Sequence, residues 1–511
     1  MPSADNKRIA KNTFFLYVRM VLVILVNLYT VRVIWQVLGI DDYGVYNVVG
    51  GIVTMFSFLN SAMVASSQRF ISFELGTGNK DRLTKTFSIS LRIHLILAFL
   101  IVILSETIGL WFLNTKLNIP INRIGAANWV YQCSIIAFVI NIISVPYNAC
   151  IVAHEHMKAF GYFGILEVII KLLIVFLLLL IPFDKLITYA VLIVMMSATM
   201  RMIYGYYCRR NFEECRFRIV SDPHLMKDMF AFAGWSFVGN LGFSVKDQGL
   251  NILINMFFNV AVNAAKGIAT QVGSVINGFA QSFQMAINPQ ITKRYAAGDI
   301  KSMINLVFSG CKYSVFLMLI IVLPLIMAAD PILHLWLDDV AEYTTGFLQL
   351  TLVVALIDSI VNPITTALQA TGKIKRFQII ISIIMIANIP FAWLWLSSDL
   401  NPYIVVFVAG ITSVVAVIAR LVLLHELVSY SYRAYFIQVI VPILITVTIT
   451  SLVNWFIYKL YSQTFGGLLC YGVTSVVASG LIIYLLGLNV TERKAVNATI
   501  ATSVSKIFKS H

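Results

Sequence analysis

The side chains best suited to bind a charged ligand are lysines, arginines and aspartates inside long apolar segments. Lys246 and Asp247 are neighbours in one such segment, Lys266 lies in the next, and Arg19 lies in the first. A charge within apolar surroundings is costly unless it is paired or solvated, so each of these residues is a candidate for function. Lysine and arginine are also the side chains that hold phosphate best. The surplus of cations therefore predicts a site for an anion, bound by Arg19, Lys246 and Lys266.

Polar side chains accompany these charges at helical spacing. They are Ser236, Asn240, Ser244, Asp247, Asn251 and Asn255 in one segment, and Asn263, Lys266, Thr270, Ser274, Asn277, Gln281, Gln284 and Asn288 in the next. Residues three or four positions apart share one helical face, and a polar face is costly against lipid. We interpret the stripes as the lining of a water-filled cleft, with Asn27, Asn251 and Gln281 as further ligand contacts. The alternative is a hydrogen-bonded seam between helices.

Acidic residues at similar depth are fewer, and they suggest a second role. Asp247 and Asp358 are candidates to couple transport to a cation, either Na⁺ or a proton. Two other charges have simpler interpretations, because Arg32 and Arg420 lie near segment ends and can extend toward the interface. The six cysteines are scattered, so neither a metal site nor any other cofactor is expected. No base and nucleophile are arranged for catalysis, so the chain is not expected to be an enzyme.

The composition decides which elements must position these residues. Of 511 residues, 59% are hydrophobic and 12% are charged, whereas soluble domains are about 45–50% apolar and about 25% charged. Windows of roughly 20 apolar residues predict about fourteen transmembrane helices in an all-α integral membrane protein. They lie near 13–36, 44–66, 86–112, 126–152, 160–182, 187–208, 229–256, 262–289, 304–328, 346–370, 377–397, 402–424, 435–458 and 467–488.

The loop charges predict the orientation of these helices. About 24 Lys and Arg residues lie on the side shared by both termini and about four on the other side. Both ends are therefore expected in the cytoplasm. The net charge of +14 follows from these loops and needs no nucleic acid partner.

An internal repeat divides the chain. Pro146, Ala153, Lys158 and Phe160 recur 217 positions later, and Gly78–Asn79 recurs 220 positions later as Gly298–Asp299. Both offsets equal six predicted spans, so the repeat is parallel and relates two like bundles. We predict an N-lobe at 1–208, a cytoplasmic inter-lobe loop at 209–228, a C-lobe at 229–426, and two further helices with a tail at 427–511.

Several local motifs resemble those of Wzx-type polysaccharide flippases, which belong to the multidrug/oligosaccharidyl-lipid/polysaccharide (MOP) exporter superfamily. They are KNT at 11–13, LGIDDYGVY at 38–46, RFISFELG at 69–76 with Gly78–Asn79, and ATGK at 370–373. The resemblance implies two six-helix lobes that open alternately to either face. It also implies a substrate in which a polyprenyl diphosphate, here undecaprenyl diphosphate, bears a short glycan. A polysaccharide polymerase, a chain-length regulator and membrane lipids are the implied partners.

Three other functions compete with this expectation. A peptidoglycan-precursor (lipid II) flippase would have the same span count and a cationic cavity. Drug/cation antiporters of the same superfamily favour acidic cavities, so the surplus of cations argues against them. A glycan polymerase or ligase would need a large external loop, and the longest external loops here are short.

Overall fold

The computed structural model of this chain is helical wherever it assigns regular structure to the described residues. It describes residues 57–490, apart from 117–120, 217, 219, 221, 259, 337–339, 399–400 and 462–463, together with 13, 15–26, 29–30, 33–34, 37–38, 42, 45–46, 49–50, 492–494 and 497. An all-α architecture is what the long apolar windows predict, because a helix satisfies its own backbone hydrogen bonds within lipid.

The chain divides into two compact units, which we call the N-terminal unit (12–240) and the C-terminal unit (241–511). The N-terminal unit contains an apolar helix at Phe15–Val26, then α2 (Ser57–Thr77), α3 (Lys80–Leu104), η1 (Ser105–Gly109), α4 (Leu110–Lys116), η2 (Ile121–Arg123), α5 (Ile124–Ala153), α6 (Met157–Leu180), α7 (Lys185–Asn211) and η3 (Glu213–Cys215). The predicted loop at 209–228 and the other lobe limits remain predictions.

Helix α8 (Pro223–Phe257) contributes to both units. The C-terminal unit continues with α9 (Val260–Ala296), α10 (Ile300–Met327), α11 (Ala329–Trp336), α12 (Thr344–Asp358), α13 (Val361–Ala370), α14 (Lys375–Ser398), α15 (Ile404–Leu427), α16 (Tyr432–Tyr435), η4 (Phe436–Ile440), α17 (Val441–Leu460), α18 (Phe465–Ile482) and η5 (Ile483–Gly487).

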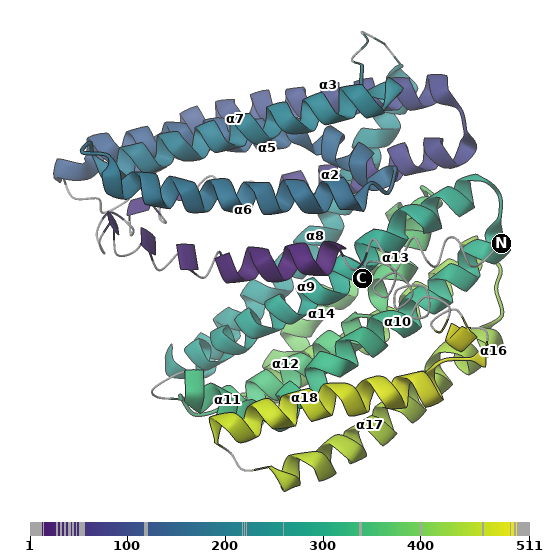
Figure 1. The fold of residues 1–511 in the computed structure, drawn as a ribbon. Coiled ribbons are helices and arrows are strands. Elements are labelled where there is room, and N and C mark those ends of the chain that lie inside the picture. The colour runs from purple at the N-terminus through teal and green to yellow at the C-terminus, as the bar shows by residue number, and fades with distance from the viewer. Residues whose placement is uncertain are drawn as a thin grey trace, which may run out of the picture. The chain divides into compact units, whose positions relative to one another are not determined.

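In the N-terminal unit, α5 packs against α2, α3 and α7, and α6 packs against α7 (Figure 1). Tyr131 and Tyr147 of α5 are fully buried, and Phe87 of α3 meets Tyr147 edge to face at 5.2 Å. Aromatic pairs in this geometry add to the stability gained from buried area. The α5 helix is therefore the core of this unit.

In the C-terminal unit, α10 packs against α9, α12, α13, α17 and α18. Its Met318 and Val322 are fully buried beside Phe347 and Leu352 of α12. The last two long helices, α17 and α18, lie side by side in Figure 1 and pack on α10. The two helices predicted beyond the twelve of the repeat thus belong to the C-terminal unit.

Ten helices in the described residues are long and apolar enough to cross a membrane. Each of the ten corresponds to a predicted span, and the chain is a multi-pass membrane protein. Helices α8 and α9 are not among the ten, although they have 35 and 37 residues. Both coincide with predicted spans and carry the polar stripes.

The predicted repeat is visible in the backbone of the turns. Gly78 and Gly298 both have left-handed φ angles, of 74° and 77°. The residue after each of them caps the next helix, since Asn79 accepts from Arg82 N–H and Asp299 accepts from Ser302 N–H. At the other offset, Glu155 (φ 61°) lies 217 positions before Gly372 (φ 76°). Equivalent turns at equivalent positions support a duplicated six-helix bundle.

Candidate anion-binding site

The polar stripe of α9 has two parts with different surroundings. Thr270, Ser274 and Gln281 are exposed, together with Ser244 and Asp247 of α8. These exposed side chains form the open part of the stripes, and the cleft that they would line remains a prediction.

The C-terminal part of the α9 stripe is instead a seam between helices. Gln284 Nε2 donates to Ser314 Oγ at 3.2 Å and to the carbonyl of Ser359 at 3.0 Å. Asn288 Nδ2 donates to Asn362 Oδ1 at 3.0 Å. Amides joined in this way hold helices together within lipid. For these two residues the seam interpretation is therefore correct.

Lys246 forms the centre of a charged cluster in the C-terminal unit. Its Nζ lies 3.3 Å from Asp247 Oδ1, and the Lys246 side chain is 14% exposed whereas that of Asp247 is 67% exposed. The ammonium also lies 5.6 Å from the centre of the Phe243 ring. A cation held between a carboxylate and a ring is only partly neutralised when the carboxylate faces outward.

Lys266 of α9 belongs to the same cluster. Its Nζ donates to Asn251 Oδ1 at 2.7 Å, and it interacts electrostatically with Asp247 and Lys246. Two predicted ligand contacts, Lys266 and Asn251, are therefore directly joined. An amide oxygen positions an ammonium without cancelling its charge, so Lys266 keeps its attraction for an anion.

Asp358 at the end of α12 completes the cluster. It interacts with Ser413 of α15 and, electrostatically, with Lys246, Asp247 and Arg420. Four helices, α8, α9, α12 and α15, thus bring together three cations and two carboxylates. The cluster carries a surplus of one positive charge.

Arg420 corrects the sequence interpretation. We expected it to extend to the interface, but it is 2% exposed. Its guanidinium lies 5.9 Å from the ring of Phe377 on α14, and its Nε has no hydrogen-bond partner in the described part of the chain. A buried arginine needs a counter-charge, and Asp358 supplies it. The helix face on which Arg420 lies is set by the packing of α14 and α15, which its position along the segment does not reveal.

Arg19 lies in the N-terminal unit. Its guanidinium is 4.5 Å from the centre of the Phe160 ring, and its Nε has no hydrogen-bond partner among the described residues. A Cβ added at Gly164 of α6 would lie 2.0 Å from that Nε. The Arg19 side chain therefore packs directly against the backbone of α6 at Gly164. Asn27 lies outside the described residues.

One further predicted contact, Gln281, is not bonded to the charged cluster among the described residues. Gln281 is exposed on α9, and no hydrogen bond joins it to the charged cluster among the contacts described. The buried Lys312 of α10 is bound elsewhere, because its Nζ contacts both carboxylate oxygens of Glu492 at 2.7 Å. Ser413 could not be predicted as a neighbour of Asp358, since a single serine in an apolar span is commonplace.

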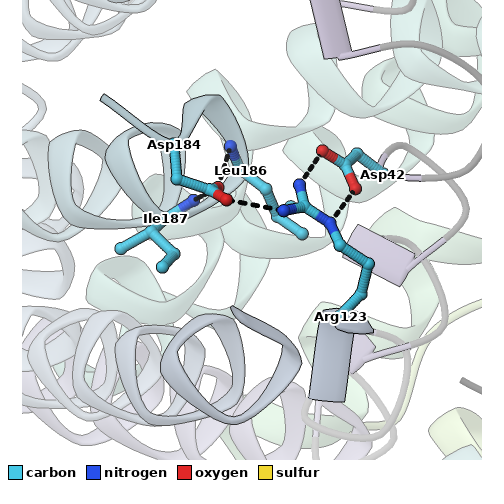
Figure 2. Close-up of polar contacts among 5 residues, drawn as sticks. All are labelled: Asp42, Arg123, Asp184, Leu186 and Ile187. Carbon is cyan, nitrogen blue, oxygen red and sulfur yellow. Dashed lines mark hydrogen bonds and ion pairs between the residues drawn. The ribbon is translucent and has the colours of Figure 1, made fainter. Parts of the chain in front are cut away.

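A second charged group lies at the opposite end of the N-terminal unit's helices from its glycine turn. Figure 2 shows the Arg123 guanidinium between two carboxylates. Its Nε donates to Asp42 Oδ1 at 2.6 Å, its Nη2 also contacts Asp42, and its Nη1 donates to Asp184 Oδ2 at 2.6 Å. Asp184 in turn accepts from the N–H groups of Leu186 and Ile187, and so caps α7. This arginine clamp joins three segments by charge-assisted hydrogen bonds.

The clamp predicts a pH-dependent contribution to stability. Burial raises the pKa of Asp184, but hydrogen bonds from Ile187 N–H and Arg123 lower it by more, so its pKa lies below the ordinary value. A carboxylate with a lowered pKa stabilises the fold above its unfolded pKa, and that contribution is lost as the pH falls through the folded value. Arg123→Gln should therefore lower the free energy of unfolding by about 2 kcal/mol at pH 7 and weaken its dependence on acid.

The measurement is thermal unfolding of the purified protein in detergent between pH 3 and pH 7. Arg376→Gln is a matched control, because Arg376 pairs with Glu426 at 2.6 Å but is 68% exposed. Exposed pairs contribute less than about 1 kcal/mol. Equal losses in the two variants would contradict the role of the clamp.

No metal centre is apparent in the part of the chain that the structure describes, where no three His, Cys, Asp or Glu side chains are grouped to hold an ion. His154 instead contacts Glu214 at 2.5 Å and stacks on Phe212 at 4.1 Å. His94 is buried, with Nδ1 2.7 Å from the carbonyl of Ser90. These two histidines lie in packing contacts.

Comparison with known families identifies two related models. Residues 9–295 match the family described as polysaccharide biosynthesis protein, and residues 236–394 match the family described as MatE. The first match covers more than half of the chain. No curated protein matches the sequence significantly.

Solved structures share the fold at low sequence identity. A crystal structure of MATE in complex with MaD3S has a TM-score of 0.71 at 13% identity, over 83% of this chain and 97% of that one. An outward-facing multidrug resistance MATE family transporter of the MOP superfamily has a TM-score of 0.70 at 15% identity, over 84% and 98%. A mutant of a Vibrio cholerae MATE transporter has a TM-score of 0.70 at 15% identity, over 85% and 99%.

Proposed function

We propose that this chain, which belongs to the polysaccharide biosynthesis protein family of the MOP exporter superfamily, is a flippase. Its substrate would be a polyprenyl-diphosphate-linked oligosaccharide repeat unit destined for a surface polysaccharide such as O-antigen, capsule or exopolysaccharide. The observation that carries this proposal is the cluster of Lys246, Lys266 and Arg420 with only two carboxylates, beside the exposed polar side chains of α8 and α9. The predicted resemblance to the MOP superfamily is confirmed by both family matches.

The chemistry of the cluster fits a diphosphate better than a cation. Lys266 is held by an amide oxygen, and Lys246 has one carboxylate that faces outward. Both ammonium groups can therefore donate to phosphate oxygens. We assign the diphosphate to Lys246 and Lys266, and Arg19 of the N-terminal unit remains a separate candidate for binding an anion. Asn251, Gln281 and Asn27 are assigned to the glycan, because amides and hydroxyls pair well with sugar hydroxyls.

Transport would proceed by alternating access, with no bond made or broken. In this proposal the protein lies in the bacterial inner membrane with both termini in the cytoplasm. Asp247 and Asp358 are the candidates for coupling to Na⁺ or a proton. Undecaprenyl diphosphate is the proposed carrier lipid, and a polysaccharide polymerase and a chain-length regulator are the proposed partners on the far side.

A drug/cation antiporter is the second candidate, favoured by the MatE match at 236–394 and by the shared fold. The surplus positive charge of the cluster argues against it, because a cationic drug would be repelled. A lipid II flippase would use the same charge chemistry, and only the identity of the glycan separates the two.

The experiment is deletion of the gene in its host, followed by mass spectrometry of the membrane lipids. We expect diphosphate-linked glycan to accumulate and surface polysaccharide to be lost, with both restored by a plasmid copy. The mass of the accumulated lipid identifies the glycan and separates a repeat unit from lipid II. Normal surface polysaccharide together with new sensitivity to toxic cations would instead establish drug efflux.

The role of Arg19 in transport can be tested by a substitution that displaces its guanidinium and keeps its charge. Gly164→Ala would place a methyl group where the Arg19 side chain lies, 2.0 Å from Nε and 2.7 Å from Cδ, and would displace the guanidinium from Phe160. Gly161→Ala is the matched control on the same helix, because its nearest neighbour would be Phe15 O at 3.5 Å, an ordinary contact.

We expect surface polysaccharide to fall at least about fivefold in Gly164→Ala, which corresponds to roughly 1 kcal/mol, and to change less than twofold in Gly161→Ala. Protein amounts in the membrane should be equal. If Gly164→Ala exports normally, the position of Arg19 does not matter to transport.

A further inference from the structure

In this structure Lys246 is paired with one carboxylate of the C-terminal unit and interacts electrostatically with a second. Asp247 Oδ1 lies 3.3 Å from its Nζ, and Asp358 interacts with it electrostatically from α12. The two carboxylates differ in their surroundings. The Asp247 side chain is 67% exposed, whereas Asp358 also interacts with Ser413 and Arg420 of α15.

Lys266 provides a contrast within the same cluster. Its partner is the neutral amide of Asn251, at 2.7 Å. Asp247 interacts with Lys266 only electrostatically, so an anion that approaches Lys266 displaces no paired carboxylate, whereas an anion that approaches Lys246 must displace Asp247. The two lysines are not equivalent, although both lie in polar stripes.

We infer that Asp247 and Asp358 are resident counter-anions, which hold Lys246 in the empty transporter and compete with the substrate diphosphate for it. The inference rests on the proposed function and deepens it. A transporter must bind its substrate tightly enough to capture it and weakly enough to release it. Carboxylates that pair with Lys246 again would lower the affinity for the diphosphate and so favour its release.

This role predicts an effect on the affinity for an anion that is opposite to the effect of a residue that contacts the anion directly. Removing the charge of either carboxylate should tighten the binding of an anion, because Lys246 no longer has to leave a partner. Transport should nevertheless slow, because the substrate leaves less readily. A coupling site for a cation would instead lose ion dependence without a gain in affinity for the anion.

The test measures the binding of undecaprenyl diphosphate to the purified full-length protein in nanodiscs, by native mass spectrometry. We expect Asp247→Asn and Asp358→Asn each to lower the dissociation constant about threefold to tenfold. Asp330→Asn is the matched control, because Asp330 belongs to the same unit but lies beside His334 and is 66% exposed. It should leave the dissociation constant unchanged.

A double-mutant cycle separates a direct effect on Lys246 from a general change in structure. In a Lys246→Ala background, Asp247→Asn should tighten binding less than twofold, because the lysine for which it competes is absent. An equal gain with and without Lys246 would overturn the inference. If Asp358→Asn fails to fold, because Arg420 then lacks its counter-charge, Asp247→Asn alone provides the test.

The outcomes distinguish this inference from the proposed function. Failure of the unaltered protein to bind undecaprenyl diphosphate would contradict the proposed function itself. Binding by the unaltered protein, with unchanged or weaker binding by both aspartate variants, would overturn only the role of the carboxylates.

Discussion

Lys246→Ala and Lys266→Ala should each reduce export of surface polysaccharide by at least about thirtyfold while leaving the protein folded in the membrane. Each substitution removes an ammonium that we assign to the substrate diphosphate. Loss of one partner from a desolvated charge pair costs roughly 2–5 kcal/mol, and 2 kcal/mol already corresponds to about thirtyfold. Asn251 and the carboxylates would remain in place.

The measurement is the amount of surface polysaccharide in a deletion strain that carries each variant, normalised to protein in the membrane. Lys301→Ala is the control, because Lys301 is an exposed lysine near the start of α10. Lys246→Arg and Lys266→Arg should retain part of the activity, since the charge is kept while the geometry changes. Full export by both alanine variants would contradict the anion-binding site.

The second large effect concerns stability and not transport. Lys312 is 6% exposed and Glu492 is 14% exposed, and the lysine Nζ lies 2.7 Å from both carboxylate oxygens. Glu492 also accepts from Asn489 N–H, while its own N–H donates to Asn489 Oδ1. The segment that follows the last long helix is thereby attached to α10. Lys312→Ala would leave a buried carboxylate unpaired.

Removal of one partner from a buried ion pair costs about 3–5 kcal/mol, so the midpoint of thermal unfolding of Lys312→Ala should fall by several degrees. Lys301→Ala, on the same helix but exposed, should unfold like the unaltered protein. The double variant Lys312→Met with Glu492→Gln should regain part of the loss, because neither charge is left alone. Equal midpoints for the two alanine variants would show that the pair contributes nothing.

Much of the fold could be predicted because lipid imposes simple rules on sequence. Long apolar windows must be helices, and the ten apolar spans of the structure coincide with predicted ones. The repeat was also predictable, because a left-handed turn favours glycine. The two left-handed turns therefore have glycine at equivalent positions, Gly78 and Gly298, which are 220 residues apart.

The site was less predictable, because helical spacing identifies a face but not what covers it. Thr270 and Gln284 belong to one stripe, yet Thr270 is exposed and Gln284 is bonded to α10 and to the end of α12. The burial of Arg420 likewise depends on how α15 packs. Pairs between distant positions, such as Lys312 with Glu492, required the fold itself.

The LGIDDYGVY motif illustrates the same limit. Its Asp42 contributed to the resemblance, but no role for the residue followed from the sequence. The structure places this carboxylate on Arg123, which also contacts Asp184. Arg123 lies between the predicted spans 86–112 and 126–152, and its two partners lie 81 and 61 positions away.

The most direct test of the central claim is translocation in proteoliposomes that contain only the purified protein and a fluorescent undecaprenyl-diphosphate-linked oligosaccharide. A membrane-impermeant reductant then reports the fraction of label on the outer leaflet. We expect the protein to exchange the labelled lipid between leaflets, and the double variant Lys246→Ala with Lys266→Ala not to do so. No exchange by the unaltered protein, together with proton- or sodium-driven movement of an organic cation, would contradict the flippase and establish an antiporter.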